Sequence, residues 1–306
     1  MIVKVLGSSA GGGFPQWNCN AALSRLAWDR DDRVAARTQS SIAVSAEGDG
    51  WIVINASPDI RQQIAAAPEL QPRRGGPARN SPIEAVILTN GDVDHVAGLL
   101  SLRERQPFRL YATARILSIL EQNSIFDVLA ADVVERIAVD FDEPAAPLEV
   151  SGLDVEAFPV SGKVPLYLED QNAGAAPGTQ IGDTIGLKIT STGSGTLFYI
   201  PGCAFIGGDL LGRLHRADCL LFDGTVFTDT EMIELGVGQK TGRRMGHVPI
   251  SGEGGSLHAF GESAITRKVY IHINTTNPIL KSGSEPEQAV EAAGWEIAFD
   301  GMTIEL

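Results

Sequence analysis

The chain has 306 residues, 43% of them hydrophobic, which is enough to bury a substantial core and excludes a mainly disordered protein. Its 24 basic and 38 acidic residues leave a formal charge of −14, so nucleic acid is not expected as a partner. No apolar run reaches the roughly 18 to 20 residues of a membrane span, and residues 1–13 lack the apolar core of a signal peptide. We therefore expect a cytoplasmic protein with no membrane partner.

The expected elements are mostly short strands, because 34 glycines and 16 prolines fall mainly between β-branched runs. Ser284 and Glu287 form a capping box at the start of the last helix, and residues 295–305 read as a closing hairpin around Asp300. The strands are expected at 2–6, 41–46, 51–54, 83–89, 151–160, 183–200, 219–223 and 268–273, the helices at 97–105, 113–131 and 285–293, and a mobile loop at 164–182.

Two groups of strands with flanking helices, and no Pro/Ser-rich linker between them, predict an α/β (α+β) protein. The expected architecture is one αββα sandwich domain that spans residues 1–306. Three cysteines with no CxxC pair indicate that disulfides do not hold this fold together.

The densest polar cluster is residues 89–95, TNGDVDH, between a predicted buried strand and the helix after it. Functional groups of α/β layer proteins collect at such strand ends. Asp92, Asp94 and His95 could converge there on one cation from a tight turn. The alternative is that Asp94 and His95 only cap the helix, since Asp is a common cap. Three potential ligands in four residues exceed what a cap requires, so we favour the metal site.

Two further candidate ligands lie at the ends of other predicted strands. Asp223 ends the apolar run 219–223, where a buried carboxylate would need a cation or an Arg/Lys partner. His272 lies at the end of the strand predicted at 268–273, before a polar turn. A single histidine is more often structural than a ligand, so the combination indicates the site and no single residue does.

These motifs, in this order, resemble the metallo-β-lactamase-fold superfamily, whose first metal motif reads T-H-x-H-x-D-H after a strand. In that frame Asn90 and Asp92 replace the two leading histidines, while Asp94 and His95 match the last two positions. A narrower resemblance, which runs essentially from end to end, is to the family of coenzyme pyrroloquinoline quinone (PQQ) biosynthesis B proteins. It is carried by residues 11–20 (GGGFPQWNCN), 57–62 (SPDIRQ), 223–225 (DGT) and 272–278 (HINTTNP).

The resemblance implies a metallo-β-lactamase-like αββα sandwich with an altered metal site. In dinuclear hydrolases of the fold, the leading histidines and a later one build the first zinc site, which is largely dismantled in this chain. The remaining set mixes oxygen and imidazole ligands, which suit iron or manganese at least as well as zinc. We expect one ion, Fe²⁺ first, held by Asp94, His95 and His272, with Asp92 and Asp223 completing or tuning the site.

The same family often carries a structural zinc knot, C-N-C-x-x-C. Here Cys19 is followed by Ala21 and Ser24 at the other two cysteine positions, so a thiolate-rich zinc site cannot be completed.

The PQQ family resemblance implies a role in the biosynthesis of that cofactor, which is assembled from a glutamate and a tyrosine of a precursor peptide. The tyrosine ring must gain oxygen to become a quinone. We therefore expect a non-haem iron-dependent hydroxylase that acts on the ring of a Glu–Tyr precursor with dioxygen, alongside other proteins of the PQQ pathway.

His247 is the candidate for proton transfer at the substrate hydroxyl, with Asp92 as a second catalytic candidate. Lys240, Arg243 and Arg244 crowd beside His247 and could bind the carboxylates of the substrate, although a solvated basic loop explains them equally well.

Two other functions stay open. A metal-dependent hydrolase would use a metal-bound hydroxide, and loss of the leading histidines counts against it. A carrier would bind PQQ or its precursor for transport without turnover. The chain could also form a homodimer, since its C-terminal strands are expected to be exposed.

Overall fold

The computed structural model describes residues 1–140, 148–169 and 180–306. The strands of the first sheet are β1 (Ile2–Gly7), β2 (Ser41–Ser45), β3 (Trp51–Ile54), β4 (Ile83–Ile87), β5 (Phe108–Ala112), β6 (Val134–Ala138) and β14 (Thr303–Glu305). Those of the second sheet are β7 (Leu148–Val150), β8 (Leu153–Pro159), β9 (Ile185–Thr190), β10 (Leu197–Ile200), β11 (Cys219–Asp223), β12 (Arg267–Ile271) and β13 (Trp295–Ile297). The helices are α1 (Ala22–Trp28), α2 (Ile60–Ala66), α3 (Val93–Val96), α4 (Ala114–Glu121), α5 (Gly208–Leu214), α6 (Glu231–Glu234), α7 (Ser256–Ala259) and α8 (Glu285–Ala292).

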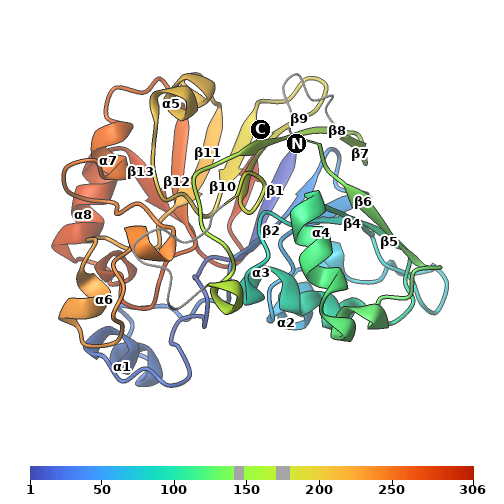
Figure 1. Ribbon diagram of the computed structural model, residues 1–306, viewed down its shortest axis with the longest axis horizontal. Coiled ribbons are helices and arrows are strands. Elements are labelled where there is room, and N and C mark those ends of the chain that lie inside the picture. The colour runs from blue at the N-terminus through green and yellow to red at the C-terminus, as the bar shows by residue number, and fades with distance from the viewer. Residues whose placement is uncertain (141–147, 170–179) are drawn as a thin grey trace.

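Within the described residues the strand orders are β14-β1-β2-β3-β4-β5-β6 and β13-β12-β11-β10-β9-β8-β7. The two sheets face each other in the middle of the molecule, with α2, α3 and α4 outside the first sheet and α5, α7 and α8 outside the second (Figure 1). This is the predicted αββα sandwich.

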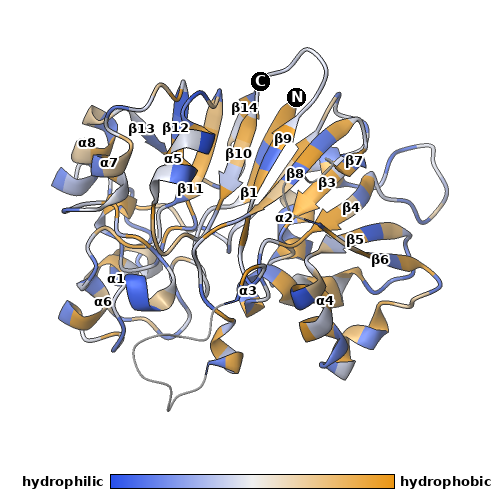
Figure 2. Cartoon of the chain, turned by 45° about the horizontal axis from the view of Figure 1, so that its top comes forward, coloured by the Kyte–Doolittle hydropathy of each residue, from blue (hydrophilic) through white to orange (hydrophobic). Residues whose placement is uncertain are grey.

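Successive side chains along each strand point to opposite faces of the sheet, and this alternation builds the layers. Ile42 and Val44 of β2 join the apolar core between the two sheets, whereas Ala43 between them joins the core under the helices of the first sheet. Successive strand residues point to opposite faces, so a strand covered on both sides is apolar at nearly every position. The colouring in Figure 2 shows the consequence, with hydrophobic residues concentrated in the strands and hydrophilic residues on the outer faces of the helices.

The two sheets are linked where β1 and β12 end, by the loop that follows β1. Ile273 N donates to Ser8 O at 2.9 Å, and Ala10 N donates to Ile273 O at 2.9 Å. β4 of the first sheet runs parallel to its neighbours β3 and β5, as β11 does to β10 and β12 of the second. The carboxyl ends of these strands open on the same crevice, which is where the chemistry-bearing loops lie.

The expected closing hairpin at 295–305 is wrong. β13 pairs with β12 in the second sheet, and β14 pairs with β1 in the first. The reason is Asp300, whose carboxylate accepts hydrogen bonds from the backbone N and hydroxyl of Ser8 and from those of Thr38. Asp300 therefore anchors a crossing between sheets instead of a tight turn.

Several expected elements are shorter than the sequence suggested. The helix expected at 113–131 stops at Glu121, where Asn123 Nδ2 binds the Ile119 carbonyl at 2.7 Å, and a 3₁₀ turn follows. The helix expected at 97–105 is instead a 3₁₀ helix over Ala97–Leu102 that continues α3. The run 183–200 divides into the antiparallel pair β9 and β10.

The loop expected at 164–182 is described only at its two ends, because residues 170–179 lie outside the described part of the chain. Its first part contains a 3₁₀ turn, Leu166–Leu168. Tyr167 Oη donates to Gly91 O at 2.8 Å, so this turn is fixed against the loop after β4. No helix in the described ranges is both long enough and apolar enough to cross a bilayer.

Candidate metal centre

The loop after β4 presents its polar side chains around the short helix α3. Asp92 occupies the N-cap position with an extended backbone, but its side chain makes no capping hydrogen bond. Its Oδ1 instead accepts from Leu166 N at 3.0 Å and lies 3.7 Å from Lys163 Nζ. Asp94 and His95 lie in the first turn of α3. Helix capping therefore does not account for these acidic residues.

His95 is 1% exposed and holds its ring in one orientation. Its Nδ1 lies 2.7 Å from Asn90 Oδ1, an acceptor, so Nδ1 carries the hydrogen. Its Nε2 is then a lone-pair nitrogen, and this buried atom has no hydrogen-bond partner among the described residues. Buried polar atoms are almost always satisfied, so an orphaned imidazole nitrogen marks a position for a ligand. From the sequence, Asn90 was interpreted only as the replacement of a metal-binding histidine. In the structure it is the residue that orients His95.

His272 comes from the opposite sheet, directly after β12. Its backbone has a φ of 59°, a left-handed conformation that is unfavourable for a non-glycine residue. Its Nε2 lies 3.1 Å from Asp94 Oδ2, and the rings of His95 and His272 are 5.3 Å apart between centroids. Potential ligand atoms of Asp94, His95 and His272 all lie within 4.8 Å of one another, so the three could hold one metal ion.

The charges of this group are strongly coupled. Burial would raise the pKa of the Asp94 carboxyl, but His95 and the hydrogen-bonded His272 outweigh it and hold that pKa below its usual range. Burial lowers the pKa of His95 to about 4, against the opposing effect of Asp94. For His272 burial acts in the same direction, yet the hydrogen bond and charge of Asp94 raise its pKa overall. At neutral pH the site thus offers an ionised carboxylate and a neutral His95.

Asp223 ends β11, as predicted from the sequence, and is fully buried. Its carboxylate accepts from Cys203 N at 2.9 Å and from the hydroxyl of Thr225 at 2.6 Å. His247 Nδ1 lies 2.8 Å from its Oδ2, and the His247 ring stacks on His272 at 5.1 Å. The sequence predicted a cation or an Arg/Lys partner for this carboxylate, and the groups that contact it here are a backbone N–H, a hydroxyl and an imidazole. Asp223, His247 and His272 form a second group close enough to hold an ion.

Asp94, His95, His247 and His272 line a pocket of about 460 Å³. Its wall carries Lys163 and Lys240, both ion-paired with Glu169, and Asp92 lies beside Lys163. Of the three basic residues predicted to bind substrate, Lys240 lines this pocket, whereas Arg243 and Arg244 do not. Arg243 instead donates to the Gly254 carbonyl at 3.1 Å.

Comparison with known proteins places this geometry in a family. A model of the beta-lactamase superfamily domain matches residues 50–273. A coenzyme PQQ synthesis protein B from Methylorubrum populi is 56% identical over 100% of both chains. The chain belongs to the coenzyme PQQ synthesis protein B family.

Solved structures agree with this assignment. A Zn²⁺-bound PqqB from Methylobacterium extorquens is 54% identical and superposes with a TM-score of 0.95 over 100% of both chains. A diphosphatase of the PhnP family, 20% identical, has a TM-score of 0.70 over 100% of this chain and 97% of its own. At that identity the second likeness shows a shared fold alone.

This family member departs from the zinc-knot pattern where the sequence indicated. Ala21 precedes α1 at its N-cap, and Ser24 is buried with its hydroxyl 2.9 Å from Thr275 Oγ1. Within the described residues Cys19 belongs to neither of the two groups that could hold an ion. The side chain at position 24 is therefore engaged with Thr275.

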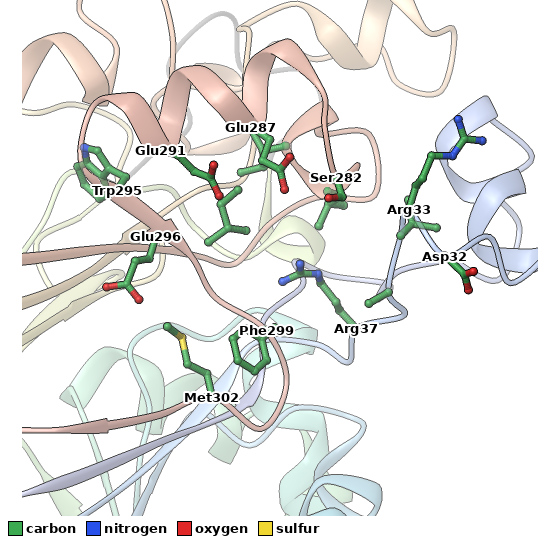
Figure 3. Close-up of a pocket in the computed structure, with 15 residues that line it drawn as sticks. Asp32, Arg33, Arg37, Ser282, Glu287, Glu291, Trp295, Glu296, Phe299 and Met302 are labelled. Carbon is green, nitrogen blue, oxygen red and sulfur yellow. The ribbon is translucent and has the colours of Figure 1, made fainter.

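A second cavity, also about 460 Å³, lies near α8, and none of the predicted site residues lines it. Figure 3 shows Arg37 extending toward Glu287 and Glu291 across it. Arg37 also donates to the Ala298 carbonyl, just before the segment that crosses between the sheets. We regard this as a structural support of the crossing.

Proposed function

We propose that this chain is a mononuclear iron-dependent hydroxylase of PQQ synthesis that acts on the tyrosine ring of a Glu–Tyr precursor. The observation that carries the proposal is the convergence of Asp94, His95 and His272 at a pocket. Two imidazoles and one carboxylate with open positions are the ligand set of non-haem Fe(II) oxygenases.

The residues fit a divalent cation on their own chemistry. His95 Nε2 is buried and unpartnered in the described chain, and Asp94 Oδ2 lies 3.8 Å from it. His272 Nε2 faces the same carboxylate oxygen. The set holds nitrogen and oxygen donors but no thiolate, which suits iron and manganese as well as zinc. Membership of a family with a Zn²⁺-bound relative supports a metal site without selecting the metal.

The net reaction converts a ring C–H and O₂ into a phenol and water, and takes two electrons and two protons from an external reductant such as ascorbate. Ferrous iron, when bound, would supply dioxygen activation. His247 would take up the proton of the substrate hydroxyl through its Nε2, because its Nδ1 is engaged with Asp223. Asp92 keeps Lys163 oriented at the pocket wall.

The charged wall would bind the polar ends of the substrate. Lys163 and Lys240 are cationic groups in a protein of charge −14, and each is compensated in the free protein by Glu169. A substrate carboxylate would replace Glu169 as their partner, so the ring would lie toward His272. A pocket of this size is in the range of small-molecule sites.

The test begins with elemental analysis of protein purified without added metal, followed by anaerobic ferrous loading. Oxygen uptake is then measured with Glu–Tyr peptides and with their cross-linked form, in the presence of ascorbate. We expect stoichiometric iron and substrate-dependent uptake, with product gaining one oxygen atom. His95→Ala and His272→Ala should lose both, whereas His258→Ala, at an exposed histidine on α7, should retain them.

Other outcomes would overturn the proposal. Zinc at two per chain, with ester or phosphodiester cleavage and no oxygen uptake, would favour the hydrolase. Micromolar binding of PQQ that is independent of metal and of His95 would favour the carrier.

A further inference from the structure

The hydroxyl of Thr225 lies at the centre of the two groups of candidate ligands. It is 2.6 Å from Asp223 Oδ1, 2.8 Å from His272 Nδ1 and 3.0 Å from His247 Nδ1. The residue is 4% exposed, so water does not compete for these contacts. Its backbone is fixed as well, since Thr225 N donates to Asp223 and Thr225 O accepts from Asn274 N.

The hydrogen count decides which atoms donate. A hydroxyl has one hydrogen and two lone pairs, and an ionised carboxylate only accepts. The hydroxyl faces two acceptors, Asp223 Oδ1 at 2.6 Å and the His272 carbonyl at 3.0 Å, and the shorter contact to the charged carboxylate takes the hydrogen. The lone pairs of the hydroxyl then face the two imidazoles. A nitrogen that faces a lone pair must donate, so Nδ1 of His272 carries a hydrogen. The same holds for Nδ1 of His247, which also faces the Asp223 carboxylate at 2.8 Å.

We infer that Thr225 is a positioning residue that keeps a hydrogen on Nδ1 of His272, as the Asp223 carboxylate does for His247. Without a cation, Nε2 of His272 donates its own hydrogen to Asp94 Oδ2, 3.1 Å away. A bound cation would replace that hydrogen and take the Nε2 lone pair, while the Nδ1 hydrogen stays on the line to Thr225. A ring with hydrogen on Nε2 alone could not bind a metal through that atom.

The same assignment explains why one ion is expected rather than two. His247 Nδ1 lies beside Asp223 and His272 Nδ1 beside Thr225, and these two nitrogens could serve a second ion only if they were free of hydrogen. Thr225 instead occupies the centre of this second group. Its hydroxyl therefore turns a potential second metal site into a hydrogen-bonded support for the first.

This inference rests on the proposed cation site but not on hydroxylation. Its test therefore measures Co²⁺ binding and not catalytic activity. We compare Thr225→Val, which keeps the shape and removes the hydroxyl, with Thr225→Ser, which keeps the hydroxyl. Co²⁺ affinity is measured by titration of the visible absorption band, and imidazole tautomers are read from ¹⁵N shifts of labelled histidine.

We expect Nδ1-protonated rings for His247 and His272 in the parent and in Thr225→Ser, with cobalt affinity unchanged within about twofold. Thr225→Val should lose this tautomer at His272 and bind Co²⁺ about 10- to 100-fold more weakly, as removal of a partner of a ligating histidine does. The thermal unfolding of each variant is recorded first, so that weak binding by an unfolded chain is recognised.

Two results would overturn the inference. One is wild-type cobalt affinity and unchanged ¹⁵N shifts in a folded Thr225→Val protein. The other is a parent protein whose His272 carries hydrogen on Nε2 and none on Nδ1. Neither result bears on whether iron supports hydroxylation, and an inactive iron-loaded protein with the expected tautomers would refute only the proposed function.

Discussion

Gly98→Ala tests how tightly the ligand-bearing helix is docked. A Cβ at position 98 would lie 2.0 Å from Ser57 O and 2.7 Å from Ala56 O. Both are backbone atoms, so no side chain can rotate away. Gly98 N also donates to Ala56 O at 2.8 Å, and Ala56 N donates to His95 O at 2.8 Å. The clash therefore displaces the helix that carries His95.

The magnitude follows from the distances. Real Cβ atoms essentially never approach another atom closer than 3.0 Å, so the backbone must separate by about 1 Å. Overpacking of this kind costs about 3 kcal/mol. Unfolding entropy of roughly 2.1 cal/mol/K per residue over 306 residues gives about 0.64 kcal/mol/K. We expect the Tm to fall by about 5 °C, together with at least a roughly tenfold loss of Co²⁺ affinity.

The control is Gly212→Ala. Gly212 is an exposed residue of α5, and a Cβ there meets nothing within 4 Å. In a helix interior alanine is favoured over glycine by roughly 0.5–1 kcal/mol, so this variant should melt about 1 °C higher with unchanged metal affinity. Differential scanning calorimetry measures both. Equal melting temperatures for the two variants, or wild-type cobalt binding by Gly98→Ala, would refute the reasoning.

Three further predictions use the same assays. Addition of Fe²⁺ at 100 times its Kd under anaerobic conditions should stabilise the fold by about 2.7 kcal/mol, and His95→Ala should abolish this shift; an equal shift in the variant would contradict the assigned ligand. Asp300→Ala leaves two backbone donors, of Ser8 and Thr38, without their acceptor and should cost about 3 kcal/mol in urea unfolding, so a loss below 1 kcal/mol would be inconsistent with the crossing described. Ser284→Ala removes the N-cap of α8 and should cost about 1 kcal/mol, measured by the same unfolding curve, whereas Ser284→Thr should restore most of it.

The sequence predicted the layers of this fold because local signals were strong. Apolar runs bounded by turn residues mark β2, β3 and β11, and the Ser284 cap marks α8. It failed at residues 295–305, since an Asp-Gly turn signal is local while the acceptor role of Asp300 depends on Ser8, almost 300 residues earlier. No periodicity in the chain carries that pairing.

The candidate site was predicted only in part, because some of its residues are recognised locally and others by distant contacts. The ligand types of Asp94, His95 and His272 could be recognised from residue chemistry and family resemblance. The orienting roles of Asn90 and Thr225 depend on three-dimensional contacts between strand ends. Asn90 looked like a lost histidine, although an amide oxygen beside His95 Nδ1 follows a common rule for metal sites, in which a partner fixes the tautomer of the ligand.

The pairing of β1 with β14 brings the two ends of the chain together. Met1 N donates to Leu306 O at 2.9 Å, and N and C lie next to each other in Figure 1. The path of the chain is thus nearly a closed ring, and its first and last strands have a very large sequence separation, which raises contact order and slows folding. A short linker between these ends, with new termini opened at the exposed turn around Gly75, would give a circular permutant with the same sheets and a more local order of assembly.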